Sequence, residues 1–270
     1  MKKVGIALGG GGARGISHIK FLQVLDECNI KPSIISGTSI GAIIGAFYAS
    51  GMNGKRIEEI LNKFNLLEMS KLIDISFFSS SGLIRGKYFE EFLEETLPIK
   101  KFENLPIPLK IVATNFWKRE QIIFDSGDII PAIRASISVP GIFDPVKIGD
   151  TILIDGGMTN PVPFDIIRNE CDFCIAIDVS GKASPKSKNS LPSISQAVLT
   201  SFHIMEKALV ENKLKIFKPD IFIKPDLFDI ELMDFHKYPE ILKSVQNDSI
   251  NFRKDLENSL LKKSIFSFRL

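Results

Sequence analysis

A serine between two glycines is the first candidate for chemistry in this sequence. Ser39 is the centre of Gly37-Thr38-Ser39-Ile40-Gly41, a G-x-S-x-G pentapeptide that follows the apolar run 33–36 and precedes an Ala- and Ile-rich helical segment. In a strand–turn–helix elbow the serine backbone is strained, and a side chain at either glycine would collide with the neighbouring strand or helix. Its Oγ would be exposed at the amino end of a helix, where unpaired N–H groups favour negative charge. The pentapeptide also occurs by chance in many chains, but in this context it predicts a nucleophile at Ser39.

Four consecutive glycines, Gly9–Gly12, follow the apolar run 4–8 and precede Arg14. Without Cβ atoms, such a loop can turn backbone N–H groups toward a ligand oxygen. A glycine loop after a first strand more often indicates nucleotide binding. Here, however, Arg14 stands where the dinucleotide fingerprint has its third glycine, no acidic residue ends the second strand, and no G-K-[ST] follows. Loops at the strand ends of a parallel sheet open on one edge, so we expect this loop beside Ser39, where it would supply an oxyanion hole.

The uncharged stretch 32–54 raises membrane insertion as another interpretation. Its glycines at 37, 41 and 45 are spaced like a transmembrane dimerisation face. Pro32 and a cluster of Ser and Thr would sit badly in a lipid-exposed helix, and the stretch divides naturally into a strand and a helix. We therefore expect a strand and a helix within a folded domain.

A carboxylate at a strand end is the third candidate. The run 151–154 leaves a two-residue hairpin turn at Gly149-Asp150 and delivers Asp155-Gly156-Gly157. Most aspartates that precede glycine only form turns. Asp155, however, stands at the exit of an apolar strand, where α/β sheets bind ligands.

The chain alternates short apolar runs with amphipathic segments, as expected for an α/β fold. The expected strands are 4–8, 33–36, 109–114, 121–124, 146–148, 151–154, 173–179 and 220–223. The expected helices include 16–25, 40–50, 53–64 with Asn53 as its cap, 87–97, one capped by Asp128, 194–217, and one or two after Tyr238. Residues 66–85 are apolar but poorly periodic, which fits a lid or membrane-facing flap as well as a buried loop.

Composition narrows the class of protein. The chain has 270 residues, 44% hydrophobic and 24% charged, which suits one large α/β domain or two small ones. A net charge of +2 gives no case for nucleic acid, and a mean hydropathy of +0.13 fits contact with lipid. We expect a cytoplasmic protein, since no signal-peptide pattern opens the chain and three cysteines suit a reducing compartment. The pair Cys171 and Cys174 is expected to pack in the core. The apolar tail 265–269 fits docking on the domain, or peripheral contact with the inner membrane surface.

Four blocks stand in one order: 9–15 with Arg14, 37–41 with Ser39, 135–145, and Asp155-Gly156-Gly157. This combination resembles the patatin-like phospholipases, especially small bacterial members related to the catalytic domain of neuropathy target esterase. The resemblance spans about residues 4–226. It implies an α/β fold, a three-layer α/β/α sandwich with a mostly parallel central sheet. We expect one such domain over residues 1–270, with a C-terminal helical segment at about 236–270 that matches no motif.

The resemblance also implies a function and a set of site residues. The family hydrolyses acyl esters of phospholipids or lysophospholipids with a Ser–Asp dyad, without calcium, another metal or a cofactor. Carried over residue by residue, Ser39 would be the nucleophile and Asp155 its base, while Gly10, Gly11, Gly12 and Arg14 would form the oxyanion region. The N–H of Ile40 is a further candidate donor, and Gly37, Gly41, Gly156 and Gly157 complete the motifs. Gly9 departs from plant patatins, which have aspartate there.

Two features of the implied dyad need a physical account. An ordinary Asp, with a pKa of about 3.9, is a weak base for a hydroxyl, so we expect burial to raise the pKa of Asp155. Arg14 near a helix start is mildly unfavourable, and a partner anion would offset that. The partner could be the substrate phosphate or oxyanion, or a nearby carboxylate in a salt bridge.

Two rival functions remain open. One is an α/β-hydrolase triad in the order Ser39, Asp155 and His203 or His236. Ser39 follows the second expected strand, which is too early for that fold, and His203 lies inside a helical pattern that suggests a structural role. His18, on the first helix, is expected to be a packing or surface residue. The other rival is a lipid-binding module without turnover, against which the intact Ser39 and Asp155 argue.

Overall fold

The computed structural model describes residues 2–63, 87–182 and 191–261. Its strands are β1 Val4–Leu8, β2 Ile34–Thr38, β3 Leu109–Asn115, β4 Glu120–Phe124, β5 Val146–Ile148, β6 Thr151–Asp155, β7 Phe173–Ile177 and β8 Ile221–Ile223. Its longer helices are α1 His18–Glu27, α2 Ile40–Ala49, a helix at 54–63, α4 Lys87–Thr96, α5 Ile129–Ser136, α6 Ile194–Ile216, α7 Tyr238–Ser244 and α8 Gln246–Leu256. Short 3-10 turns include η1 Gly12–Ser17, η3 Gly156–Met158 and η5 Phe235–Lys237.

The strands form one mixed sheet in the order β5-β6-β3-β2-β1-β7-β8, with β4 paired to β3. Strands β3, β2, β1, β7 and β8 run parallel, whereas β4, β5 and β6 join as antiparallel neighbours. The parallel strands therefore end at one edge of the sheet, and the loops that follow β1 and β2 open there together. The expected α/β class with a mostly parallel centre is confirmed.

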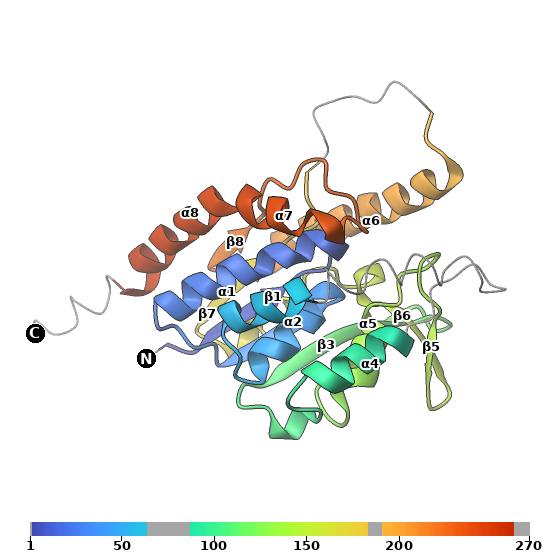
Figure 1. Ribbon diagram of the computed structural model, residues 1–270, viewed down its shortest axis with the longest axis horizontal. Helices are drawn as coiled ribbons and strands as arrows, with labels where there is room; N and C mark the ends of the chain where they lie inside the picture. Colours follow the sequence, from blue (N-terminus) through green and yellow to red (C-terminus); the bar gives the residue numbers. More distant parts are fainter. Residues whose placement is uncertain (1, 64–86, 183–190, 262–270) are drawn as a thin grey trace, which may run out of the picture.

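Side chains alternate between two buried faces of this sheet. In β1, Val4, Ile6 and Leu8 belong to the large core that includes side chains of α1, α2, α5, α7 and α8. Ala7 belongs to a second cluster, formed with the segment 162–174 and Val210 of α6. The result is a sheet between two helical layers (Figure 1), in which α6 covers the second face.

Helix α6 differs from the other helices in its position. Its amino-terminal end projects at the periphery of the described chain, at the upper right of Figure 1. Helices α7 and α8 run along α1, where the Phe21 and Phe252 rings meet edge to face at 5.8 Å. The C-terminal segment, which matched no motif in the sequence, thus builds part of the core.

Several local predictions are met by the structure. Asn53 caps the helix at 54–63 through its side chain, which accepts a hydrogen bond from the Arg56 N–H. Asp128 stands at the N-cap position of α5, as predicted, but its side chain makes no capping hydrogen bond. Cys171 and Cys174 are free thiols in the second core cluster, as predicted.

Two of the predicted segments, 66–85 and 265–269, contain residues outside the described part of the chain. The uncharged stretch 32–54 divides into β2 and α2, as expected. Across the described residues, no helix has the length and apolar character needed to span a bilayer.

Candidate active site

Ser39 sits in a strained elbow between β2 and α2. Its φ is 54°, a left-handed conformation that non-glycine residues rarely adopt. A Cβ at Gly37 would lie 2.5 Å from the Gly41 carbonyl oxygen, and one at Gly41 would lie 2.1 Å from the Leu8 oxygen. Both glycines are therefore required by close backbone approach, as the pentapeptide predicted.

The glycine loop lies directly against this elbow. A Cβ on Gly10 would stand 3.3 Å from the Ser39 Cβ. Gly10, Gly11 and Gly12 line one cavity together with Ser39 and Asp155. The two loops that follow parallel neighbours thus meet at one edge, as expected from the topology.

The backbone N–H groups of this loop divide into bonded and free donors. Gly10 N–H donates to Pro161 O at 2.9 Å, so it is already occupied. Within the described chain, the N–H group of Gly11 makes no hydrogen bond. Gly12 and Ile40 are the first residues of η1 and α2, and the first N–H groups of a helix have no acceptor within it. The expected oxyanion region therefore offers free donors at these three residues. The Gly10 N–H is used by the bond to Pro161 O, so Gly10 holds the shape of the loop and has no donor left for a substrate oxygen.

Asp155 ends β6 and is buried in the same cavity, with a side chain 3% exposed. Its Oδ1 accepts a hydrogen bond from the Gly157 N–H at 2.7 Å, while Oδ2 has no partner of normal geometry among the described residues. Burial raises the pKa of Asp155 to about 7, although the Gly157 N–H and the Ser39 hydroxyl act to lower it. The Ser39 hydroxyl is thus close enough to act on this carboxyl group, although no hydrogen bond of normal geometry joins the two side chains.

Close approach to a backbone requires the first glycine after Asp155, whereas the second glycine faces the end of a flexible side chain. A Cβ on Gly156 would lie 2.3 Å from Val112 O, and one on Gly157 would lie 2.4 Å from a carboxylate oxygen of Glu206. Small residues at both positions let the turn pass between β3 and α6.

The carboxyl end of α5 holds both candidate catalytic residues. Ser136 Oγ accepts a hydrogen bond from the Ser39 N–H at 2.8 Å and donates to Val112 O at 2.6 Å. Two residues later, the carbonyl oxygen of Ser138 accepts a hydrogen bond from the Asp155 N–H at 2.9 Å. One short turn therefore fixes the backbone at Ser39 and at Asp155, and sequence reasoning did not find this role of Ser136.

Helix α6 forms the roof of the cavity. Leu199, Phe202, His203 and Glu206 project from it beside Ser39 and Asp155. His203 Nε2 lies 3.3 Å from an Arg14 guanidinium nitrogen, and its Nδ1 lies 3.1 Å from Glu206 Oε2. Both ring nitrogens of His203 are thus occupied away from Ser39, so the structure does not assemble a Ser–Asp–His triad. His236 is exposed and does not line the cavity.

Arg14 is buried, and burial lowers its pKa. It donates to the carbonyl oxygen of Ser180 and contacts His203. Within the described residues it makes no ion pair, and its Nε has no partner. The salt bridge considered for Arg14 is therefore not seen there. Glu206 and Asp178 offset part of the cost of burying its charge.

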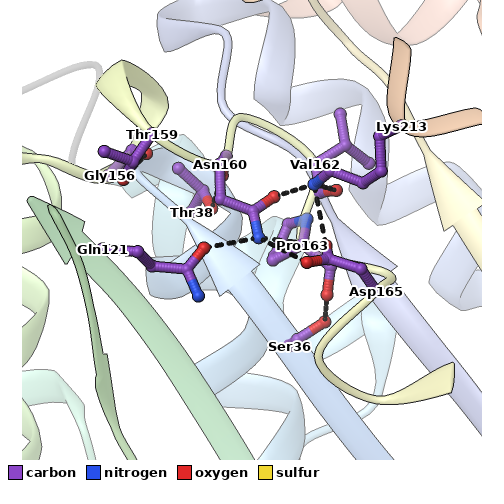
Figure 2. A network of polar contacts seen from close by, with 10 residues as sticks. All are labelled: Ser36, Thr38, Gln121, Gly156, Thr159, Asn160, Val162, Pro163, Asp165 and Lys213. Carbon is purple, nitrogen blue, oxygen red and sulfur yellow. Dashed lines mark hydrogen bonds and ion pairs between the residues drawn. The ribbon is translucent and has the colours of Figure 1, made fainter. Parts of the chain in front are cut away.

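A polar network fastens α6 to the turn after Asp155 (Figure 2). Lys213 of α6 donates to Asn160 Oδ1, to Val162 O at 3.0 Å and to Asp165 Oδ1 at 2.7 Å. The Asn160 carbonyl oxygen accepts a hydrogen bond from Thr38, the residue before Ser39. The roof helix, the Asp155 turn and the Ser39 elbow are thus linked by side-chain hydrogen bonds.

His18 supports the glycine loop through a buried contact with its backbone. It is fully buried, and its Nε2 lies 2.9 Å from Gly9 O. Burial lowers the pKa of His18 to about 4, so the ring is neutral at pH 7 and donates through Nε2. The expectation of a packing residue is right about its burial but missed this contact.

The comparisons with known proteins agree with this arrangement. The family model described as "Patatin-like phospholipase" matches residues 6–168. The chain belongs to the patatin-like phospholipase family. An NTE family protein of Mycobacterium bovis is 32% identical over 196 residues, which are 71% of this chain and 53% of that protein. Lysophospholipase NTE1 of Candida glabrata is 25% identical over 265 residues, 89% of this chain and 15% of that protein.

The fold comparison gives a structural neighbour as well. VipD from Legionella pneumophila superposes with a TM-score of 0.55 at 14% identity, covering 94% of this chain and 67% of that one. The chain spans about half the length of the mycobacterial relatives. In the described part of this patatin-like chain, no group of three His, Cys, Asp or Glu residues is placed to hold a metal ion.

Proposed function

We propose that this patatin-like chain is a serine acyl-ester hydrolase in which Ser39 is the nucleophile and Asp155 the base. The observation that carries the proposal is the shared cavity. It brings Ser39, a buried carboxylate with a pKa near neutrality, and free backbone donors to one place from three separate loops. A nucleophile, a matched base and an oxyanion site are the three parts that acyl transfer requires.

The reaction follows from these positions. Ser39 Oγ attacks the ester carbonyl carbon as Asp155 takes the hydroxyl proton. The negative oxygen that forms lies before the N–H groups of Gly11, Gly12 and Ile40, each of which stabilises it by about 3–4 kcal/mol. Collapse expels the alcohol, which receives the proton from Asp155. Water, deprotonated by the same carboxylate, then attacks the acyl-serine carbonyl, and the tetrahedral intermediate collapses to release the fatty acid and restore the Ser39 hydroxyl.

We propose phospholipids or lysophospholipids as substrates. The relative in Candida glabrata is named a lysophospholipase. Apolar side chains line the cavity at Val139, Met158, Leu199, Phe202 and Leu232, although its volume is only about 30 Å³, so an acyl chain would have to extend beyond it. A second cavity of about 490 Å³ shares Leu199, His203 and Leu232 with the first and reaches Arg14. An anionic head group there would lie beside a buried cation.

A long-chain fluorophosphonate followed by intact-mass analysis tests the dyad. The wild type should gain one adduct, Ser39→Ala none, and Asp155→Asn should react at least about 100-fold more slowly. Because Asp155 accepts a proton only when ionised, the labelling rate should fall about tenfold per pH unit below pH 7. Equal labelling of Ser39→Ala and wild type would overturn the nucleophile assignment.

His203→Gln separates the dyad from a triad. The dyad predicts that this variant still labels and turns over, because His203 faces Arg14 and Glu206. A loss as large as that of Ser39→Ala would favour the triad. Binding of lipid without labelling or hydrolysis across an ester panel would instead favour a non-catalytic lipid-binding module.

A further inference from the structure

One face of α6 carries an exposed apolar stripe. It consists of Ile194, Val198, Met205, Leu209 and Ile216, whose exposed fractions run from 38% to 87%. At 100° per residue these five side chains fall within an arc of about 60°. We call this surface the α6 stripe. A surface helix normally turns such an arc toward the core, so its exposure along the whole helix needs a partner.

The adjacent face of the same helix belongs to the candidate active site. Leu199, Phe202, His203 and Glu206 line the catalytic cavity, and Lys213 fastens the helix to the turn after Asp155. The α6 stripe and the roof of the cavity are therefore neighbouring faces of one helix. The sequence from 191 to 205 contains no Asp, Glu, Lys or Arg, so the projecting end of α6 is apolar or neutral on every side.

A second exposed apolar feature lies directly after β3, at the sheet edge where the parallel strands end and where the candidate site lies. Phe116 and Trp117 follow β3, are 44% and 74% exposed, and pack edge to face with ring centroids 4.9 Å apart. Two residues before this aromatic pair, Thr114 donates a hydrogen bond to Asp155 O. The pair is followed by Lys118 and Arg119. Tryptophan beside cations is the composition found where proteins meet the head-group region of a bilayer.

We propose that the α6 stripe and the Phe116–Trp117 pair form a docking surface for a lipid bilayer. The inference rests on the proposed function, because it places the mouth of the hydrolase cavity against the surface that holds its substrate. An amphipathic helix lies in the bilayer interface with its apolar face inserted. Trp117 occupies the head-group level, and Lys118 and Arg119 approach lipid phosphates. This chemistry favours a bilayer over a second copy of the chain, whose interface would be depleted of lysine.

Trp117 is the one tryptophan in the chain, so its fluorescence reports docking directly. The experiment uses full-length Ser39→Ala, which leaves the lipid intact, with vesicles of phosphatidylcholine alone or with phosphatidylglycerol added. We expect a blue shift of the emission and quenching by lipids brominated on the acyl chain, stronger with the anionic vesicles. An emission unchanged by either vesicle would overturn the docking surface at Trp117.

A double variant, Ile194→Asp with Met205→Asp, tests the stripe. Its matched control is Ile250→Asp on α8, which replaces an exposed isoleucine far from the stripe in sequence. We expect vesicle partitioning to fall by about tenfold or more in the double variant and to stay unchanged in the control. Turnover of a dispersed short-chain ester should be equal in both, while hydrolysis of vesicle lipid should fall only in the double variant. Equal unfolding midpoints of both variants show that the fold is intact.

The outcomes separate this inference from the proposed function. Vesicle binding without hydrolysis of any ester would overturn the proposed hydrolase function and support the docking surface. If the double variant hydrolyses vesicle lipid and partitions onto vesicles as well as the control, the docking surface is overturned and the proposed hydrolase function stands. A change in oligomeric mass of the double variant without lipid would show that the stripe binds a second copy, which overturns the proposal.

Discussion

At the scale of single residues, burial of the Asp155 carboxyl group lowers the stability of the fold, and the same burial brings its pKa into the range that a general base needs. Its carboxyl group is buried with one hydrogen bond, to the Gly157 N–H, and its second oxygen is left without one of normal geometry. Burial raises the pKa from 3.8 to about 7, so the native state holds this proton more tightly than the unfolded state. Between these two values each rise in pH lowers the free energy of unfolding, and above pH 7 the full cost remains.

Asp155→Asn should therefore stabilise the protein while it removes the proposed base. The gain at pH 8 should reach at most about 4 kcal/mol and shrink toward pH 4, where the wild-type carboxyl is protonated in both states. His18 acts in the opposite sense, since its lowered pKa of about 4 costs stability as pH falls below 6.5. Thermal or urea unfolding of the wild type and Asp155→Asn at several pH values measures the difference in their free energy of unfolding. Ser39→Ala should also lose stability as pH rises, over a window that extends to higher pH, because the lost hydroxyl acts to lower the pKa of Asp155. A gain from Asp155→Asn that does not change with pH would contradict the role of the buried carboxyl group.

Ser136→Ala isolates the support beneath Ser39. The change leaves the Ser39 N–H and Val112 O without a buried partner, which costs about 1–3 kcal/mol of stability. It also lets the elbow shift, so kcat and the labelling rate should fall by up to about 100-fold. Ser138→Ala on the same turn is the matched control, because its carbonyl still holds Asp155. Equal catalytic losses in the two variants would show that Ser136 has no special role.

At the scale of elements, α6 depends on a few anchors. Among the α6 residues whose burial the structure describes, Val210 alone is a buried hydrophobic residue, and Lys213 makes three hydrogen bonds to the segment 160–165. Polar contacts therefore hold the roof of the cavity at Lys213 and, in the amino-terminal half of the helix, where His203 meets Arg14.

Lys213→Met should loosen this roof. We expect a loss of about 2–3 kcal/mol, because Asp165 keeps only its bonds from Asn160. Hydrogen exchange should become faster along α6, and KM for a long-chain ester should rise. Lys215→Met is the control, since Lys215 is exposed and bonds only to Asn212. Combining Lys213→Met with Asp165→Asn should cost less than the sum of the single changes, and strict additivity would exclude the pair.

The elbow and the roof differ in how far sequence could predict them. The Ser39 elbow was readable because its constraint is steric and lies within five consecutive residues. Helix α6 was located correctly, but the structural role expected for His203 rested on the apolar residues Met205 and Leu209 near it in the helical pattern. In the structure those two side chains are exposed and His203 faces the cavity. Apolar periodicity predicts which face of a helix is buried only when the apolar residues do face the core.

At the scale of the whole molecule, the C-terminal helices complete the core on α1. Phe252 of α8 packs its buried ring on Phe21. Upstream of these helices, the carbonyl oxygen of Leu232 accepts a hydrogen bond from the Ala13 N–H beside the glycine loop. No motif marked this segment, because packing partners far apart in the chain leave no local pattern. The relation between Ser39 and Asp155 was likewise available from the family resemblance and not from local spacing.

Phe252→Ala tests the contribution of this segment to global stability. Loss of a fully buried ring should cost about 3–5 kcal/mol in urea unfolding. Ile250→Ala, two residues earlier and 44% exposed, should change stability by about 0.5 kcal/mol or less. Similar effects of the two changes would mean that α8 is not integral to the core.

The turn of α5 that supports both Ser39 and Asp155 has a consequence for the nascent chain. Ser39 and Ser136 are 97 residues apart, and the Arg14 and His203 of the roof contact are 189 apart. At a synthesis rate of about 5–20 residues per second, the elbow leaves the ribosome many seconds before its support, its base and its roof. In a nascent or truncated chain, Ser39 therefore lacks these long-range partners, and the proposed hydrolase activity can appear only after residues as late as His203 have folded onto the elbow.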